Sequence, residues 1–280
     1  MKLLRVIELI TFLCLLPLTS GAGEAQSFSF AVVPQFPATE IRRDWQPLFE
    51  RLREMTGIEF KLQFSRSISD FEQDFLRGIP DFAFLNPYHA VMAKRSQNYV
   101  PLLRDSKPLT GIIVVRSDDP ATSVRQLDRR DLAFPAPNAF GASLYLRALL
   151  AEEFHIRVTP HYVKTHSNVY RHVIMGETAA GGGVNNTLDH ESAEVRGRLR
   201  VLYETPGVAS HPIVAHPRVP ESVRKKLSEA LLRLAADPAN ALLFAAVQLP
   251  FPVVADYARD YQPLERLKLE RYVVSAEAKQ

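Results

Sequence analysis

The sequence predicts an α/β protein of two lobes, each an open sheet flanked by helices, with a ligand cleft between the lobes. Short apolar runs alternate with segments of helical periodicity, Pro, Gly and Asn separate them, and the alternation starts afresh near residue 132. Alternation of this kind is typical of sheets covered by helices on both faces. The 280 residues are 46% hydrophobic, which is enough apolar material for two modest domains.

The first block of alternation predicts three strand and helix units in a row. Residues 28–33, 60–64 and 81–85 have the composition of strands. Ile41, Trp45, Leu48, Phe49 and Leu52 recur at helical spacing up to the Gly57 stop. Residues 68–76 predict a second helix, and a third follows Pro87 through Met92. These units predict a doubly wound sheet.

The second block predicts the other lobe and a return to the first. Two more strands are expected before it, at 99–103 and 111–115. Within it, strands are expected at 132–134, 161–164, 179–184, 200–203 and 208–215, and helices at 142–154, 169–175 and 221–236. We expect the chain to cross between lobes near 111–116 and 205–211. The predicted organisation is therefore a first part of lobe I at 26–112, lobe II at 113–207, and the rest of lobe I with C-terminal helices at 208–280.

Residues 1–25 have the layout of a signal peptide. Lys2 and Arg5 precede an apolar run at 6–18, and small residues follow up to Ala25. The run is shorter than the roughly 20 apolar residues of a membrane span, which makes an uncleaved anchor the weaker alternative. The single cysteine, Cys14, lies inside this segment. We therefore expect an exported mature chain without disulfides, cysteine nucleophiles or cysteine metal ligands.

The charge pattern gives no support to nucleic-acid binding. The 34 Lys and Arg and the 31 Asp and Glu are spread along the chain without a basic block, and the net charge is +3. A mild positive charge is compatible with an anionic small ligand, and equally with a role in solubility alone.

Four junctions between strands and helices are candidate ligand contacts. They lie at 34–39, 86–89, 138–143 and 165–168, where a strand ends and a helix begins. Ligands of open α/β sheets bind at this edge, and helix starts present free N–H groups that favour an anion. The alternative is that the Ser, Thr and Asn residues there are ordinary helix caps. Tyr88 follows a helix-starting Pro and either reaches the cleft or packs in a core.

Signatures of metal, cofactor and catalytic sites are missing. None of the eight histidines lies in an HExxH pattern, and the sequence has no GxSxG elbow, P-loop or GxGxxG. We therefore predict no catalytic residue, no metal and no cofactor. The run Gly181-Gly182-Gly183 allows close approach of a ligand, or of a neighbouring helix, which is the plainer reading.

The order of several motifs resembles the phosphate/phosphite/phosphonate ABC-transporter periplasmic substrate-binding proteins, the PhnD-like family. The similarity spans nearly the whole mature chain and is carried by 45–48, 56–57, 78–83, 86–88, 166–167 and 176–180. This resemblance implies a periplasmic, type II two-lobe binding protein that closes around a tetrahedral oxyanion. Within the family pattern, Tyr88, the loop 138–143, and His166 with Ser167 are the matching positions.

Eleven residues at these junctions and strand ends are our candidate ligand contacts: Gln35, Tyr88, Asn138, Phe140, Gly141, Ala142, Ser143, His166, Ser167, Asn168 and Asn185. One departure from the family pattern affects the ligand. The family's Ser-Thr-Ser-Gly loop is replaced by Asn-Ala-Phe-Gly-Ala-Ser at 138–143, so two hydroxyl donors are lost. Each oxygen left unpaired costs roughly 1–3 kcal/mol, and Phe140 favours a ligand with an apolar portion.

The expected function is capture of a small oxyanion, phosphonate-like or a related organic anion, for an ABC importer. The expected partners are that anion and an ABC permease, the protein is expected to be a monomer, and no nucleic acid is involved. One alternative is a periplasmic partner that presents its ligand-bound form to a membrane sensor protein. A secreted hydrolase is a third possibility that no motif supports.

Overall fold

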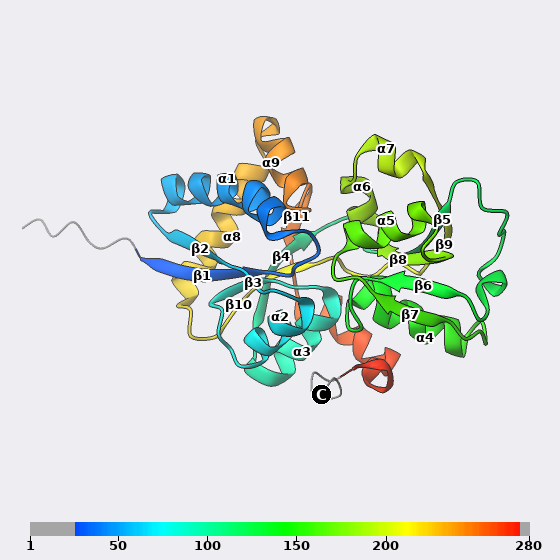
Figure 1. Ribbon diagram of the computed structural model, residues 1–280. Helices are drawn as coiled ribbons and strands as arrows, with labels where there is room; N and C mark the ends of the chain where they lie inside the picture. The colour runs from blue at the N-terminus through cyan, green and yellow to red at the C-terminus, as the bar shows by residue number, and fades with distance from the viewer. Residues whose placement is uncertain (1–25, 275–280) are drawn as a thin grey trace, which may run out of the picture.

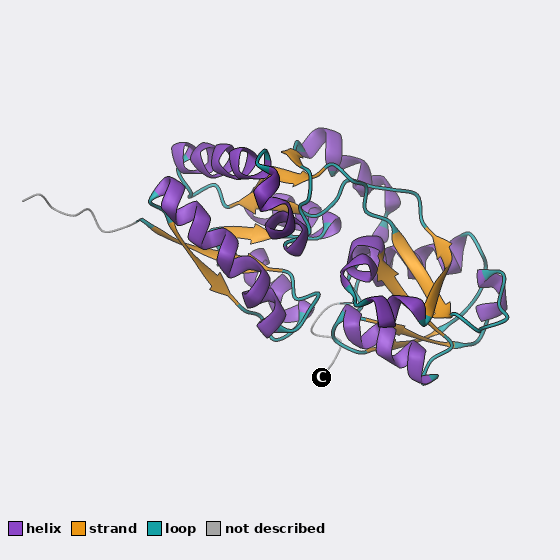
Figure 2. Ribbon diagram, turned by 90° about the horizontal axis from the view of Figure 1, so that it is seen from above, coloured by secondary structure: helices purple, strands orange, loops and turns teal. Residues whose placement is uncertain are grey.

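The computed structural model describes residues 26–274, and the predicted signal peptide lies outside them. Two sheets, each covered by helices, form two bodies side by side (Figures 1 and 2). Within the described residues, no helix is long and apolar enough to cross a membrane. The predicted α/β fold with two lobes is confirmed.

The sheet of lobe I has six strands and mixed direction. They are β1 (Ser27–Val32), β2 (Glu59–Gln63), β3 (Phe82–Phe84), β4 (Val100–Asp105), β10 (Pro212–Ala215) and β11 (Pro252–Val254), in the order β11-β4-β10-β3-β1-β2. β1 runs parallel to β2 and β3, whereas β10 lies antiparallel between β3 and β4. The start of β10 therefore meets the carboxyl ends of the parallel strands.

Helices cover both faces of this sheet. α1 (Ala38–Thr56), α8 (Glu221–Ala235) and α9 (Ala241–Ala246) lie over one face, and α2 (Ile68–Leu76) and α3 (Pro87–Gln97) over the other (Figure 1). The five apolar residues that predict α1 are all buried, and Gly57 ends the helix with a left-handed φ of 68°. Phe30 lies among Trp45, Phe49, Phe60 and Phe82 in the aromatic core of this lobe.

The sheet of lobe II has five strands. They are β5 (Gly111–Arg116), β6 (Asp131–Phe134), β7 (Thr159–Tyr162), β8 (Ala180–Val184) and β9 (Leu199–Glu204), in the order β7-β6-β8-β5-β9. α4 (Tyr145–Glu152) and α5 (His166–Met175) belong to different cores. Leu146 and Leu150 of α4 pack in one cluster, and Val169 and Val173 of α5 in the other. The two helices therefore cover opposite faces of the sheet, as the alternation predicts.

The chain passes between the sheets twice, at 106–110 and 205–211. Leu109 and Val208 form an antiparallel bridge where the two passages run side by side. The crossing predicted near 111–116 lies just before that range, because residues 111–116 form β5 at the interior of the second sheet. The lobe boundaries predicted at 112 and 207 stay a prediction.

Several element boundaries also differ from the prediction. The helix expected at 142–154 begins with a π-helical turn, Phe140–Leu144, and α5 begins at His166 rather than at residue 169. The sequence analysis missed α6 (Asn185–His190), α7 (Ala193–Gly197) and β11 because such short segments carry no readable period. The remaining short helices are Val124–Leu127, Pro238–Asn240, Tyr257–Asp260, Gln262–Leu267 and Leu269–Tyr272.

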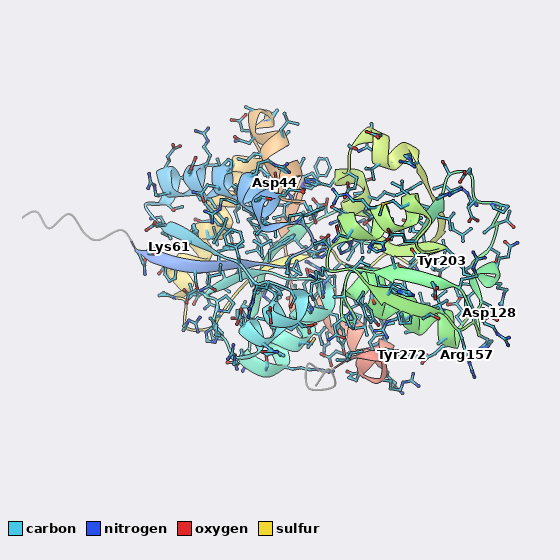
Figure 3. The ribbon with its side chains drawn as sticks, viewed as in Figure 1. Asp44, Lys61, Asp128, Arg157, Tyr203 and Tyr272 are labelled. Atoms are coloured by element: carbon cyan, nitrogen blue, oxygen red, sulfur yellow. The ribbon has the colours of Figure 1, made fainter. Side chains whose placement is uncertain are left out.

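The C-terminal segment fastens lobe I to lobe II. It runs from lobe I to the underside of α4, where Figure 3 labels Tyr272. Arg147 donates through Nη2 to the carbonyl of Tyr272 at 2.9 Å, and the backbone N–H of Val274 donates to Asn138 Oδ1 at 3.0 Å. The segment therefore holds the two lobes together on one side of the interface.

Candidate ligand site between the lobes

A small cavity lies between the two lobes, at the edge of the sheets where the predicted junctions meet. We call it the inter-lobe cavity. Its lining consists of Val33, Gln35, Ile68, Asn86, Ala139, Phe140, Gly141, Ala142, His166, Val184 and His211. Lobe I and lobe II both contribute walls, so ligand contacts there depend on how the lobes sit against one another.

The lobes are closed over this cavity. A water-sized sphere has only about 10 Å³ of space, which is room for about one water molecule. The backbone N–H of His166 in lobe II donates to the carbonyl of Gln35 in lobe I at 3.1 Å. On the upper side, His190 Nε2 lies 3.4 Å from Oδ2 of Asp44, which Figure 3 labels at the opposite side from Tyr272. Closure is therefore held at both sides of the interface.

Three helix starts converge on the cavity. Asn86 caps α3, and its side chain accepts from the N–H of His89 at 2.7 Å. His166 is the first residue of α5, whose cap Thr165 accepts from the N–H of Asn168 at 3.2 Å. The π-helical turn that leads into α4 has no side-chain cap. Free N–H groups at such starts favour negative charge.

Glycines let the backbone of the π-helical turn lie against the sheet. A Cβ atom on Gly182 would lie 2.0 Å from the carbonyl oxygen of Ala142, and one on Gly111 would lie 2.3 Å from that of Gly141. Gly181 and Gly183 are crowded by side chains of α5 in the same way. The glycine run therefore serves close packing of helices, as the plainer reading of the sequence had it.

Two buried imidazoles are the only titratable groups in the lining. His166 is 2% exposed, and burial lowers its pKa to about 3. Its Nδ1 lies 3.1 Å from Thr187 Oγ1. His211 is 3% exposed, and burial, with smaller effects of His166 and His89, lowers its pKa to about 3. Both rings are therefore neutral at pH 7 in this closed form.

The structure places five of the eleven candidate contacts in the lining, namely Gln35, Phe140, Gly141, Ala142 and His166. The other six do not line it. Ser143 Oγ accepts from Arg147 Nε at 3.2 Å, and Asn168 donates through Nδ2 to the carbonyl of Val163 at 2.8 Å. Ser167 is buried beside His166 at the start of α5. Asn185 donates to the carbonyl of Pro108 at 3.0 Å, on another pocket.

Tyr88 and Asn138 lie just behind the cavity and join the lobes. The ring of Tyr88 stacks on Phe140 with 6.3 Å between centroids, and burial raises the pKa of Tyr88 to about 12. Asn138 donates through Nδ2 to Glu72 Oε2 at 3.0 Å and to the carbonyl of Val274 at 3.0 Å. Both residues support the walls of the cavity in this closed form without lining it.

Sequence reasoning missed two polar residues of the lining, Asn86 and His211. Asn86 begins one of the four candidate junctions, 86–89, but is not among the eleven candidate contacts. His211 lies in a run that reads as a strand, 208–215. The signal that pointed to it is the polar pair Ser210-His211, which interrupts that otherwise apolar run.

A second and larger pocket flanks the passages between the sheets. We call it the crossing pocket, and it offers about 410 Å³ to a water-sized sphere. Its lining consists of Asp105, Lys107, Pro108, Leu109, Asn185, Asn186, Asp189, His190, Ser210, Leu242, Ala245, Ala246, Gln248 and Pro250. Asn186 Nδ2 donates to Gln248 Oε1 at 2.8 Å, and Lys107 pairs with Asp189 at 3.0 Å. Among residues 26–274, no group of His, Cys, Asp and Glu is arranged to hold a metal.

Comparison with known proteins identifies the family. The family model described as ABC transporter, phosphonate, periplasmic substrate-binding protein matches residues 30–261. A search of curated protein sequences found no match.

Solved structures share the fold at low sequence identity. A binding protein of an ABC phosphonate transporter from Pseudomonas aeruginosa superposes with a TM-score of 0.77, at 13% identity over 89% of this chain and 88% of that one. PhnD1 from Prochlorococcus marinus, solved with methylphosphonate, superposes with a TM-score of 0.79 at 12% identity, over 89% of this chain and 100% of that one. A Xanthomonas citri protein solved bound to ATP superposes with a TM-score of 0.67 at 17% identity, over 89% of this chain and 100% of that one.

The matched family is one of substrate-binding proteins rather than enzymes, and its model covers most of the chain, both sheets included. The chain belongs to the family of phosphonate ABC-transporter periplasmic substrate-binding proteins.

Proposed function

We propose that this protein binds a small molecule carrying a phosphorus oxyanion in the inter-lobe cavity and delivers it, in the periplasm, to the permease of an ABC importer. The convergence of three helix starts on one cavity is the observation that carries the proposal. Helix starts supply N–H donors and positive potential without a charged side chain. The family match favours import over the sensor and hydrolase alternatives.

The ligand class follows from the chemistry that the lining offers. Two of the similar structures are described with methylphosphonate and with ATP, and both molecules carry tetrahedral phosphorus with several anionic oxygens. The lining here combines backbone donors with the apolar Phe140, Ala139 and Ile68. An organic phosphonate or phosphoester, with an apolar part next to its oxyanion, matches this combination better than a bare inorganic ion.

Binding requires that the lobes open. About 10 Å³ holds a single water, whereas a phosphonate group is several times larger. The contacts that must separate include the His166 N–H to Gln35 carbonyl bond, the Asn138 to Glu72 bond, the His190 to Asp44 pair and the stacking of Tyr88 on Phe140. Each of the hydrogen bonds has a net value of about 0.5–3 kcal/mol, so contacts to the ligand have to offset their loss.

Calorimetric titration of the chain starting at residue 26 tests this proposal. The ligands are methylphosphonate, aminoethylphosphonate, phosphite, phosphate, sulfate and acetate. We expect at least one phosphorus oxyanion to bind more tightly than sulfate and acetate. Folded protein that binds none of the phosphorus compounds refutes the proposal.

A substitution in the cavity makes the test site-specific. Asn86→Asp keeps a side-chain oxygen that caps α3 but adds a carboxylate to the lining. We expect it to weaken anion binding about tenfold or more, because like charges repel strongly in a buried site. The matched control is Ser192→Asp, which changes the cap of the exposed helix α7. Equal affinity in both variants places the anion elsewhere.

A further inference from the structure

His211 is a buried polar group whose position the fold itself does not explain. It precedes β10, its ring stacks on Phe84 with 5.4 Å between centroids, and it lines the inter-lobe cavity. Its Nδ1 has no hydrogen-bond partner among residues 26–274. A buried polar atom without a partner costs about 1–3 kcal/mol. A phenylalanine or leucine at position 211 would pack on Phe84 without that cost.

The cavity contains no permanent positive charge. Its eleven lining residues include no Lys, Arg, Asp or Glu, and His166 and His211 are the only two that can become cationic. An anion that leaves water for a buried site needs a compensating charge or strong donors. The hydroxyl donors that the family loop offers are replaced here by Ala139 and Phe140.

The charged and titratable groups around His211 leave it free to take this role. His166 of α5 and His89 of α3 act on its protonation. His89 Nε2 is held by Glu72 of α2 at 2.9 Å. In the neighbouring strand β4, Arg104 pairs with Asp260 at 3.1 Å. Both carboxylate oxygens of Asp105 accept backbone N–H groups, and Tyr261 donates to the carbonyl of Ser210.

We propose that His211 of lobe I is a second imidazole donor to the bound oxyanion, together with His166 of lobe II, and that the protein takes up a proton from solvent when the anion binds. The inference rests on the proposed function and adds to it. The anion stabilises the imidazolium form, and the imidazolium in turn supplies the charge that the lining lacks. Binding therefore strengthens as the pH falls.

Calorimetry in buffers of different ionisation enthalpy measures the proton uptake. With methylphosphonate at pH 7, we expect the wild-type protein to take up more protons per ligand than His211→Gln, by up to about one. The free ligand has the same protonation in both titrations, so the difference arises in the complex. We also expect His211→Gln to bind about tenfold or more weakly.

The matched control is His216→Gln. His216 directly follows β10 at its opposite end, where its Nδ1 accepts from the N–H of Arg218 at 3.1 Å, and we expect wild-type affinity and proton uptake. His211→Asn is a second variant, should His211→Gln not fold. Spectra of wild-type protein with ¹⁵N-labelled histidine report the protonation of each ring directly, without any substitution.

Two results overturn the inference. If wild-type protein and His211→Gln bind methylphosphonate within twofold and with equal proton uptake, His211 is no donor, while the proposed function stands. If the labelled rings of His211 and His166 both stay neutral in the saturated complex, no proton enters the site. Absence of binding to every phosphorus oxyanion instead refutes the proposed function itself, and this inference with it.

Discussion

The inter-lobe cavity and the crossing pocket both lie beside the passages between the sheets, and they differ in volume and in lining. The crossing pocket is about forty times larger, about 410 Å³ against about 10 Å³. In its lining Lys107 pairs with Asp189 and Asn186 Nδ2 with Gln248, whereas the buried Asn186 Oδ1 has no hydrogen-bond partner among residues 26–274. The inter-lobe cavity is nearly filled, yet His211 there has an unpaired buried nitrogen. Volume alone therefore does not indicate the ligand site, and the helix starts of α3 and α5 in the lining of the inter-lobe cavity favour it as the proposed site.

The largest contrast between the two regions is expected from removing one phenylalanine in each. Phe140 is 2% exposed and stacks on Tyr88 and Tyr145, so Phe140→Ala should lower the free energy of unfolding by about 3–5 kcal/mol. Phe251, close to the crossing pocket, is 66% exposed, and Phe251→Ala should change the free energy of unfolding by less than about 0.5 kcal/mol. Urea denaturation measures both. Equal losses would contradict the tight packing of the inter-lobe wall.

A single methyl group tests the close approach of the π-helical turn to the sheet. Gly182→Ala places a Cβ 2.0 Å from the Ala142 carbonyl oxygen, and we expect a loss of about 3 kcal/mol together with weaker anion binding. Gly197→Ala in α7 meets nothing within 4 Å and should be neutral or stabilise by up to about 1 kcal/mol. Wild-type stability in Gly182→Ala would show that the turn does not rest on β8.

Asn138→Ala tests the link between the cavity and the C-terminal segment. It removes the bonds to Glu72 and to both backbone groups of Val274, and leaves the buried Glu72 with fewer donors. We expect a loss of about 1–3 kcal/mol in unfolding free energy. Small-angle scattering of the ligand-free variant should show a larger radius of gyration. An unchanged radius and stability would mean that other contacts hold the lobes closed.

The neutral histidines of the cavity predict a pH dependence of stability. The pKa of His166 is about 6.5 in the unfolded chain and about 3 in the folded protein, so its stabilising effect is complete above pH 6.5 and is lost as the pH falls toward 3. Between pH 5.5 and 4.5, wild-type stability should fall about 1.4 kcal/mol more than that of His166→Gln. Parallel curves in urea denaturation would show that His166 is not desolvated.

The smallest effect is expected in the crossing pocket. Leu242 is 87% exposed, so Leu242→Ser should change stability by less than about 0.5 kcal/mol and leave anion affinity unchanged. Titration with methylphosphonate checks the second point. A drop in affinity comparable to that of Asn86→Asp would mean that the larger pocket takes part in binding.

Much of the fold was predictable because its signals are local. Every strand of the two blocks and the main helices were expected near their observed positions, since apolar period, breakers and caps act within a few residues. The exceptions are α6, α7 and β11, which are too short for a period, and the first passage between sheets, which lies before β5 rather than in it. The eleven candidate contacts remain predictions, and five of them line the cavity.

The sequence by itself determined the alternation of strands and helices and the Asn and Thr residues that cap α3 and α5. Only the tertiary structure decided that His211 lines the same cavity as these helix starts. β10 inserts antiparallel between β3 and β4, so its first residues arrive at the edge where the parallel strands end. That pairing joins residues more than a hundred positions apart, and no local pattern records which strand will neighbour which.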